Sequence, residues 1–229
     1  MNQPLHSKKD PGRAGHRITV WDLPTRIFHW TLVTLVGISL ATGYAGGNWM
    51  LWHVRSGTAL LALLGFRLAW GVVGGRHARF ISFVRGPSEV WRYAASLIRK
   101  DAPRHLGHNP MGGWSVLAML GALLVQVVTG LFANDDIFTE GPLYPLVSKA
   151  TSDMLTGIHE INQGVLITLI VLHLGAIFFY LVVKRDNLIG PMITGRKDWP
   201  EAAPASEGRL WLAAVIAAVS AAGVFFLVR

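Results

Sequence analysis

The sequence contains no cysteine and few charged residues, and these two shortages exclude several classes of protein. Without cysteine the chain cannot form disulfides, hold an iron–sulfur cluster or zinc through thiolates, or attach a c-type haem through a C-x-x-C-H motif. Only 15% of the residues are charged and 52% are hydrophobic. This composition differs from that of a soluble domain and is typical of a membrane protein. Any metal must therefore be bound through nitrogen or oxygen.

Long apolar segments predict an all-α membrane protein. About 20 apolar residues cross the roughly 30 Å hydrocarbon core, and each crossing should be a helix, because a lone strand leaves its backbone polar groups unsatisfied in lipid. The five candidate spans are residues 27–46, 52–73, 113–133, 157–183 and 210–228. The basic N-terminus resembles that of a signal peptide, but no small-residue cleavage site follows it, so we expect an uncleaved first span.

Basic residues are distributed unequally between the spans. The segment up to Arg26, residues 74–112 and residues 184–209 hold five, seven and five Lys or Arg, whereas residues 47–51 hold none and residues 134–156 hold only Lys149. The net charge of +8 therefore indicates membrane orientation rather than nucleic-acid binding. The positive-inside rule predicts a cytoplasmic N-terminus and a C-terminus on the opposite side.

Two further segments predict peripheral structure. Residues 86–100 predict an amphipathic helix capped by Ser88 that lies on the inner membrane surface, with a solvated loop helix as the alternative. Residues 201–208, EAAPASEG, predict a linker, and the fifth span that follows has Ser220 as its one notably polar residue, which indicates an accessory helix. The chain is thus expected to comprise a cytoplasmic tail (1–17), a four-helix core (18–200) and a linker with an accessory helix (201–229).

Four histidines lie inside the apolar spans, at His29, His53, His159 and His173. Ionisable side chains in hydrocarbon are costly and indicate a functional site, most simply metal or haem ligands. His173 should lie about 21 Å along its helix from His159 and near the same face. Depth then allows His53 to pair with His159 and His29 with His173. Each pair would hold one iron with both axial positions filled, which suits electron transfer.

Other interpretations of these histidines are weaker. A single intramembrane histidine can be a hydrogen-bonded packing residue or a proton relay. Zinc is disfavoured, because two histidines fourteen residues apart cannot share one small ion and position 163 is Gln, which breaks the H-E-x-x-H pattern at His159. The remaining histidines lie in aqueous segments and are expected to be ordinary surface residues: His6, His16, His77, His105 and His108.

Several other residues are candidates for the same site. Arg55 and Arg67 in the second span could pair with haem propionates, with snorkelling to the interface as the alternative. Gly57 and Gly164 could let a flat macrocycle approach the backbone. A quinone or proton site, or else interhelical hydrogen bonds, would use Gln126, Asn162 and Gln163. The first and third spans both end in Thr-Gly, at 42–43 and 129–130, which indicates either an old duplication or chance.

Taken together, the motifs resemble the bacterial cytochrome b561 family, which includes the di-haem cytochrome b subunits of nickel–iron hydrogenases. The resemblance covers about residues 18–200 and rests on Phe28-His29-Trp30, His53 with Arg67, His108-Asn109-Pro110, Thr129-Gly130, and His159 with His173 before the segment 184–187. It implies a four-helix core with two haem b held by the four histidines, in the bacterial inner membrane. It also implies electron transfer between a periplasmic partner, such as a c-type cytochrome, a dehydrogenase or a hydrogenase, and membrane quinone.

Three functions are open at this point. The chain is an electron-transfer subunit, a stand-alone superoxide:ubiquinone oxidoreductase, or a transporter whose histidines relay protons. Residues 134–160 hold five acidic residues against Lys149, and an acidic rim attracts cationic proteins and repels superoxide. This charge favours the first function.

Overall fold

The computed structural model describes residues 16–97 and 103–229, and it confirms the all-α membrane fold. Within these residues, five helices are long and apolar enough to cross a membrane. They are α1 (Leu23–Ala45), α2 (Met50–Val73), α5 (Pro110–Gly130), α6 (Lys149–Val182) and α8 (Leu210–Leu227). The largest difference from the predicted spans is at α6, which begins eight residues earlier than position 157.

Capping residues explain why three of these helices begin before the apolar runs. The Asp22 carboxylate accepts a hydrogen bond from the N–H of Thr25 at 2.8 Å at the start of α1. Asn109 caps α5 in the same way through the N–H of Gly112 at 2.7 Å, and Ser148 caps α6. Each side chain satisfies a backbone donor that has no partner within the helix, so the helix begins at the cap.

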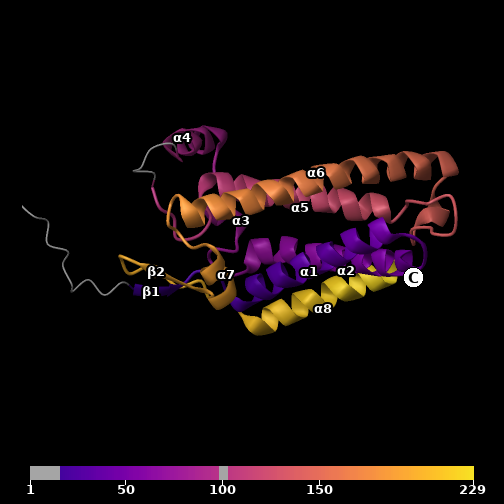
Figure 1. Ribbon diagram of the computed structural model, residues 1–229. Helices are drawn as coiled ribbons and strands as arrows, with labels where there is room; N and C mark the ends of the chain where they lie inside the picture. The colour runs from indigo at the N-terminus through magenta and orange to yellow at the C-terminus, as the bar shows by residue number, and fades with distance from the viewer. Residues whose placement is uncertain (1–15, 98–102) are drawn as a thin grey trace, which may run out of the picture.

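The spans form two helical hairpins that face each other, with α8 outside them (Figure 1). The short helix η1 (Gly47–Trp49) joins α1 to α2, α6 lies beside α5, and α8 packs along α2. The 34 residues of α6 measure about 51 Å at 1.5 Å per residue, longer than the roughly 30 Å hydrocarbon core. The buried core between the hairpins includes Phe28, Leu60, Leu64, Phe66, Leu120, Leu123, Val127 and Leu166.

The two ends of the bundle differ in structure. At one end, here called the sheet end, β1 (His16–Thr19) pairs antiparallel with β2 (Arg196–Trp199), next to α7 (Ile189–Thr194) (Figure 1). At the other, here called the loop end, residues 131–148 connect α5 to α6 and contain η2 (Tyr144–Leu146). The sequence did not predict the two strands.

The amphipathic helix between the second and third spans is present as α4 (Pro87–Leu97), which follows the short helix α3 (Phe80–Phe83). The predicted cap at Ser88 is wrong, because the helix already includes Pro87 and the carbonyl of Gly86 accepts the N–H of Glu89 at 3.0 Å. Its placement on the inner membrane surface stays a prediction. Residues 98–100 of that predicted helix, and residues 1–15 of the predicted tail with His6, lie outside the described residues.

The predicted linker is attached to the sheet end rather than free. Ser206 is buried, its N–H donates to the carbonyl of Thr19 at 2.8 Å, and its hydroxyl oxygen accepts the N–H of His77 at 3.2 Å. Residues 201–208 therefore bind the strand before α1 to the turn after α2. The domain division of the chain stays a prediction.

Asp22→Ala should be the most destabilising alanine substitution at the sheet end, because the buried carboxylate of Asp22 also accepts the N–H of Gly75 at 3.0 Å and the indole N–H of Trp70 at 3.4 Å. We expect Asp22→Ala to lower the free energy of unfolding by about 3 kcal/mol, since it leaves buried donors unpaired. Denaturant unfolding in detergent measures this. Asp198→Ala removes an exposed carboxylate of β2 as a control, and equal stability of the two variants would contradict the prediction.

Candidate functional site

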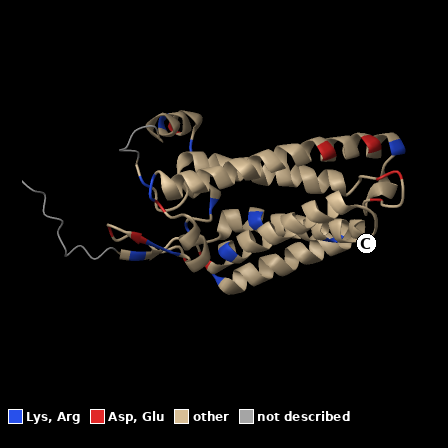
Figure 2. Ribbon diagram, in the orientation of Figure 1, with Lys and Arg blue, Asp and Glu red and all other residues tan. Residues whose placement is uncertain are grey.

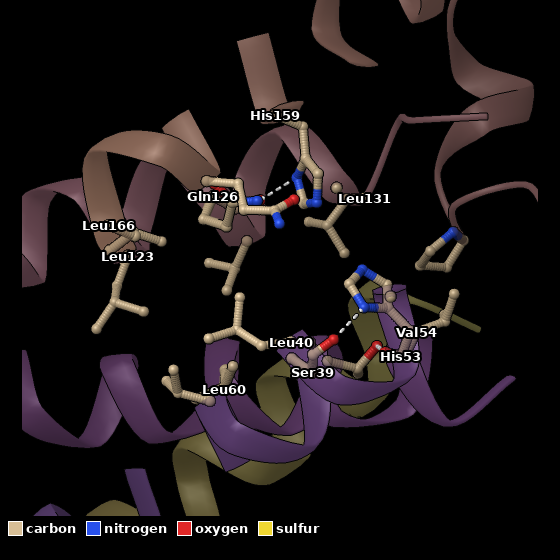
Figure 3. Close-up of a pocket in the computed structure, with 18 residues that line it drawn as sticks. Ser39, Leu40, His53, Val54, Leu60, Leu123, Gln126, Leu131, His159 and Leu166 are labelled. Carbon is tan, nitrogen blue, oxygen red and sulfur yellow. Dashed lines mark hydrogen bonds between the residues drawn. The ribbon is translucent and has the colours of Figure 1, made fainter. Parts of the chain in front are cut away.

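His53 of α2 and His159 of α6 face each other across the bundle (Figure 3). Their ring centroids are 6.0 Å apart and their planes make an angle of 79°. Two metal–imidazole bonds of about 2 Å, with about 1 Å more from each nitrogen to its ring centre, separate two centroids by roughly 6 Å. The spacing therefore matches one metal atom bound between the two rings.

The hydrogen bonds of both rings leave one nitrogen available as a ligand. Nδ1 of His53 lies 2.8 Å from the carbonyl oxygen of Ser39, and Nδ1 of His159 lies 2.9 Å from that of Gln126. A carbonyl only accepts hydrogen bonds, so each Nδ1 carries the proton and each Nε2 keeps its lone pair. Such a bond fixes the tautomer and orientation of a metal-binding histidine.

Glycines let the neighbouring helices approach these two rings. A Cβ atom on Gly43 would lie 2.9 Å from Nδ1 of His53, and one on Gly130 would lie 2.9 Å from Cε1 of His159. Both distances are too short for a real Cβ, so a larger residue at either position must displace an imidazole.

The repeated Thr-Gly pairs thus have a structural counterpart. The carbonyl that holds His53 is at position 39 and the glycine is at 43, and the carbonyl that holds His159 is at 126 with its glycine at 130. The intervening Thr42 and Thr129 both bond back to their own helices. α1 and α5 therefore support the two rings with the same three-residue arrangement, which sequence reasoning noticed only as a repeat.

The rings border a largely apolar pocket between α1, α2, α5 and α6 (Figure 3). Gly57 lines it with open space beyond its Cα, whereas Gly164 is not among its lining residues. Within residues 16–97 and 103–229, no three His, Cys, Asp or Glu gather to hold a bare ion. A porphyrin supplies four ligands itself, so two imidazoles and apolar walls fit a haem.

The second predicted pair, His29 of α1 and His173 of α6, lies nearer the sheet end. The two side chains are close enough to interact electrostatically. Nδ1 of His29 is buried and has no hydrogen-bond partner in the described part of the chain. An unpartnered buried nitrogen is uncommon and indicates a site that a ligand completes.

Arg67 is deeply buried near the inner pair, with only 4% of the residue exposed. Its guanidinium lies over the rings of Phe80 and Phe28, at 4.8 and 5.8 Å from their centroids. One terminal nitrogen has no hydrogen-bond partner among the described residues. A buried guanidinium nitrogen without a partner is costly, so this group fits a position next to an anion such as a propionate.

Arg55 lies elsewhere. It is exposed, its guanidinium is 5.3 Å from the ring centroid of Trp52, and it does not line the pocket between His53 and His159. This position favours the snorkelling alternative over a propionate contact.

His108 differs from the ordinary surface histidine that the sequence predicted. Its ring lies 4.7 Å from that of Trp21 and 4.5 Å from that of Phe83, and its Nδ1 is buried without a partner in the described segments. Burial, and then the nearby charge of Arg67, lower the pKa of His108 to about 3. The signal available in the sequence was its position directly before the cap Asn109.

The other loop histidines divide into two kinds. Burial lowers the pKa values of His77 and His105, and each has a buried ring nitrogen without a partner among residues 16–97 and 103–229. The prediction of ordinary surface histidines is therefore wrong for both. His16 is exposed on β1, as expected.

The amide residues of α5 and α6 form interhelical hydrogen bonds. The amide nitrogen of Asn162 donates to Oε1 of Gln126 at 2.7 Å and to the carbonyl of Ala122 at 2.9 Å. This contact joins the two helices beside His159 and favours the packing alternative for these two residues. Gln163 lines the pocket.

Comparison with known proteins indicates the class of this site. The sequence matches the family described as prokaryotic cytochrome b561 over residues 20–195. It is 24% identical to the "Probable Ni/Fe-hydrogenase B-type cytochrome subunit" of Rhizobium leguminosarum bv. viciae, over 79% of this chain and 88% of that one. It is also 24% identical to the protein of the same name from Azotobacter vinelandii, over 82% and 91% of the two chains. No solved structure matches significantly.

Proposed function

This chain belongs to the prokaryotic cytochrome b561 family, and we propose that it carries electrons through two haems from a redox partner at the loop end to membrane quinone. Membership makes it a multi-pass bacterial membrane protein and a b-type cytochrome of electron transfer, which removes the transporter interpretation. The two haems, the quinone and the identity of the partner are the proposal.

The observation that carries the proposal is the facing pair of imidazoles with free Nε2 atoms, 6.0 Å apart between centroids. His53 and His159 would hold the outer haem, and His29 and His173 the inner one. Haem iron with two imidazole ligands supplies a one-electron carrier with no open position for oxygen. The carbonyls of residues 39 and 126 fix the orientation of both outer rings, so each Nε2 would be positioned to bind the iron.

Other residues near the two histidine pairs determine the polarity and charge around the proposed haems. Leucine and valine side chains line much of the pocket around the outer pair. Arg67 offers a buried positive charge beside the inner pair, where it would neutralise a propionate and favour the arrival of an electron. Orientation follows from the basic segments: the sheet end faces the cytoplasm and the loop end faces the periplasm.

The loop end carries the acidic residues that a cationic partner would meet (Figure 2). Lys149 pairs with Asp136 at 2.5 Å and with Asp153 at 2.6 Å, so two of the five acids are partly neutralised. Slight desolvation raises the pKa of Asp135, but hydrogen bonds from the backbone N–H groups of residues 137–139 outweigh it and lower this pKa to about 2. Asp135 therefore stays charged. The end keeps a net negative charge.

The hydrogenase subunits among its relatives make a hydrogenase the leading partner, with a c-type cytochrome or a dehydrogenase as alternatives. Direct oxidation of superoxide is the second candidate function. The net negative charge at the loop end repels that small anion, whereas it attracts a basic protein surface. The charge therefore favours a protein donor.

Docking at the acidic end should depend on ionic strength. We expect the double variant Glu140→Gln, Glu160→Gln to be reduced about threefold to tenfold more slowly by a basic c-type cytochrome at low salt, because electrostatic steering is weakened. Stopped-flow haem absorbance measures the rate. High salt should remove the difference, and an uncharged chemical reductant serves as the control. Equal rates for both proteins at low salt would contradict this docking surface.

A further inference from the structure

Three arginines surround a second hollow at the sheet end, between the end of α2 and the start of α8. The hollow is open to solvent. Its charged residues are Arg76, Arg79, Arg209 and Glu207, and Val73 and Leu212 are among its apolar residues. None of its residues lines the pocket of His53 and His159.

The guanidinium groups of this hollow are available to a ligand. Arg76, Arg79 and Arg209 are exposed, and none of their side chains has a hydrogen bond or ion pair within the described ranges 16–97 and 103–229. With Glu207 as the single acid, the hollow has a net charge of two positive. Arginine offers paired N–H donors that match the oxygens of a phosphate, so the hollow has the chemistry of a phosphate site.

The surroundings of the hollow are apolar and exposed. Val72 and Val73 at the end of α2 are 69% and 51% exposed, and Leu210 and Trp211 at the start of α8 are 58% and 64% exposed. Tryptophan at the end of a membrane-spanning helix is typical of the membrane–water interface. The hollow therefore lies where two spans leave the hydrocarbon, at the level of lipid phosphates, and most Lys and Arg in Figure 2 lie toward this end.

We propose that this arginine hollow binds the phosphate of an anionic phospholipid whose acyl chains cover the apolar residues beside it. Arg79 of the turn after α2 and Arg209 at the start of α8 would bind one headgroup from both sides. Free inorganic phosphate would satisfy the guanidinium groups but would leave Val72, Val73 and Trp211 uncovered. Basic pockets between spans on the cytoplasmic side are suited to anionic lipid headgroups, which supports the lipid as occupant.

Native mass spectrometry of the full-length haem-loaded protein in detergent tests the proposal. We expect phosphatidylglycerol to bind in preference to phosphatidylcholine. Arg79→Gln and Arg209→Gln should each weaken phosphatidylglycerol binding roughly fivefold, which corresponds to about 1 kcal/mol for one arginine near a lipid headgroup. Arg92→Gln, which removes an exposed arginine of α4 outside the hollow, should leave binding unchanged.

The outcomes separate the two sources of phosphate. Inorganic phosphate at millimolar concentration should fail to displace the lipid; displacement by phosphate alone would overturn the proposal in favour of a free anion. Equal binding of phosphatidylcholine, or equal weakening by Arg92→Gln, would also overturn it. The haem absorbance of each variant confirms folding, and Arg76→Gln replaces any variant that fails to load haem. Because the readout is lipid binding, its result is independent of the proposed electron donor.

Discussion

Replacing His159 with alanine is expected to leave one haem per chain instead of two. In the proposed site His159 would supply one of the two imidazole ligands of the outer haem, and His53 alone would hold that haem through a single bond. His29 and His173 lie on the sheet-end side and do not line the outer pocket, so the inner haem should be retained. Extraction of protohaem from purified protein, normalised to chain concentration, measures the loss.

The matched control is His16→Ala, which removes an exposed histidine of β1 and should keep both haems. His173→Ala gives the reciprocal result, with loss of the inner haem and retention of the outer one. Two haems in the His159→Ala protein would mean that the outer pair is assigned wrongly. Loss of haem from the control as well would show that the assay reports folding instead of ligation.

Replacing Gly130 with valine should have the second largest effect, although this residue binds nothing itself. Its Cβ would lie 2.9 Å from Cε1 of His159, so valine must push the imidazole away from its position opposite His53. Changes next to a metal ligand commonly cost about 10- to 100-fold in affinity, and we expect retention of the outer haem to fall by that factor. Haem transfer from the variant to an excess of an apo-haemoprotein measures it.

Position 121 on the same helix provides a sensitive control. A Cβ on Gly121 meets no atom within 4 Å, so Gly121→Val tests the cost of valine in α5 without contact to the site. Gly43→Val and Gly37→Val form the equivalent pair on α1, where Gly43 contacts His53 and Gly37 has open space. If the two variants of either pair release haem at the same rate, the glycines do not position the rings.

The sequence predicted the spans, because long apolar runs are read directly from residue type, but it did not predict the two strands. β1 and β2 are four residues each and lie about 180 positions apart, so no local pattern indicates that they pair. The start of α6 was missed for a related reason. Residues 149–156 are mixed in polarity, and the helix begins there because Ser148 caps it.

Helix geometry explains why Arg67 lies inside the bundle and Arg55 does not. Fourteen residues separate His53 from Arg67, which places them within about 40° of the same face. Twelve residues separate Arg55 from Arg67, which turns them about 120° apart. Burial of one and exposure of the other follow, and this difference could have been predicted from spacing alone.

The histidine positions show both what spacing can give and what it cannot. Depth and helix face predict that His53 approaches His159, but the carbonyls of Ser39 and Gln126 that fix the two rings are backbone atoms, which any residue type would supply. His108 was misjudged because its neighbours Trp21 and Phe83 come from other segments of the chain. Contacts between distant segments require the structure.

The number of haems per chain in the purified wild-type protein tests the central claim most directly. Pyridine haemochrome absorbance against quantitative amino-acid analysis gives this ratio without any assumption about donor or quinone. Two intramembrane histidine pairs predict two protohaems per polypeptide, both low-spin. A ratio of one, or a high-spin spectrum, would contradict the assignment of four histidines to two irons.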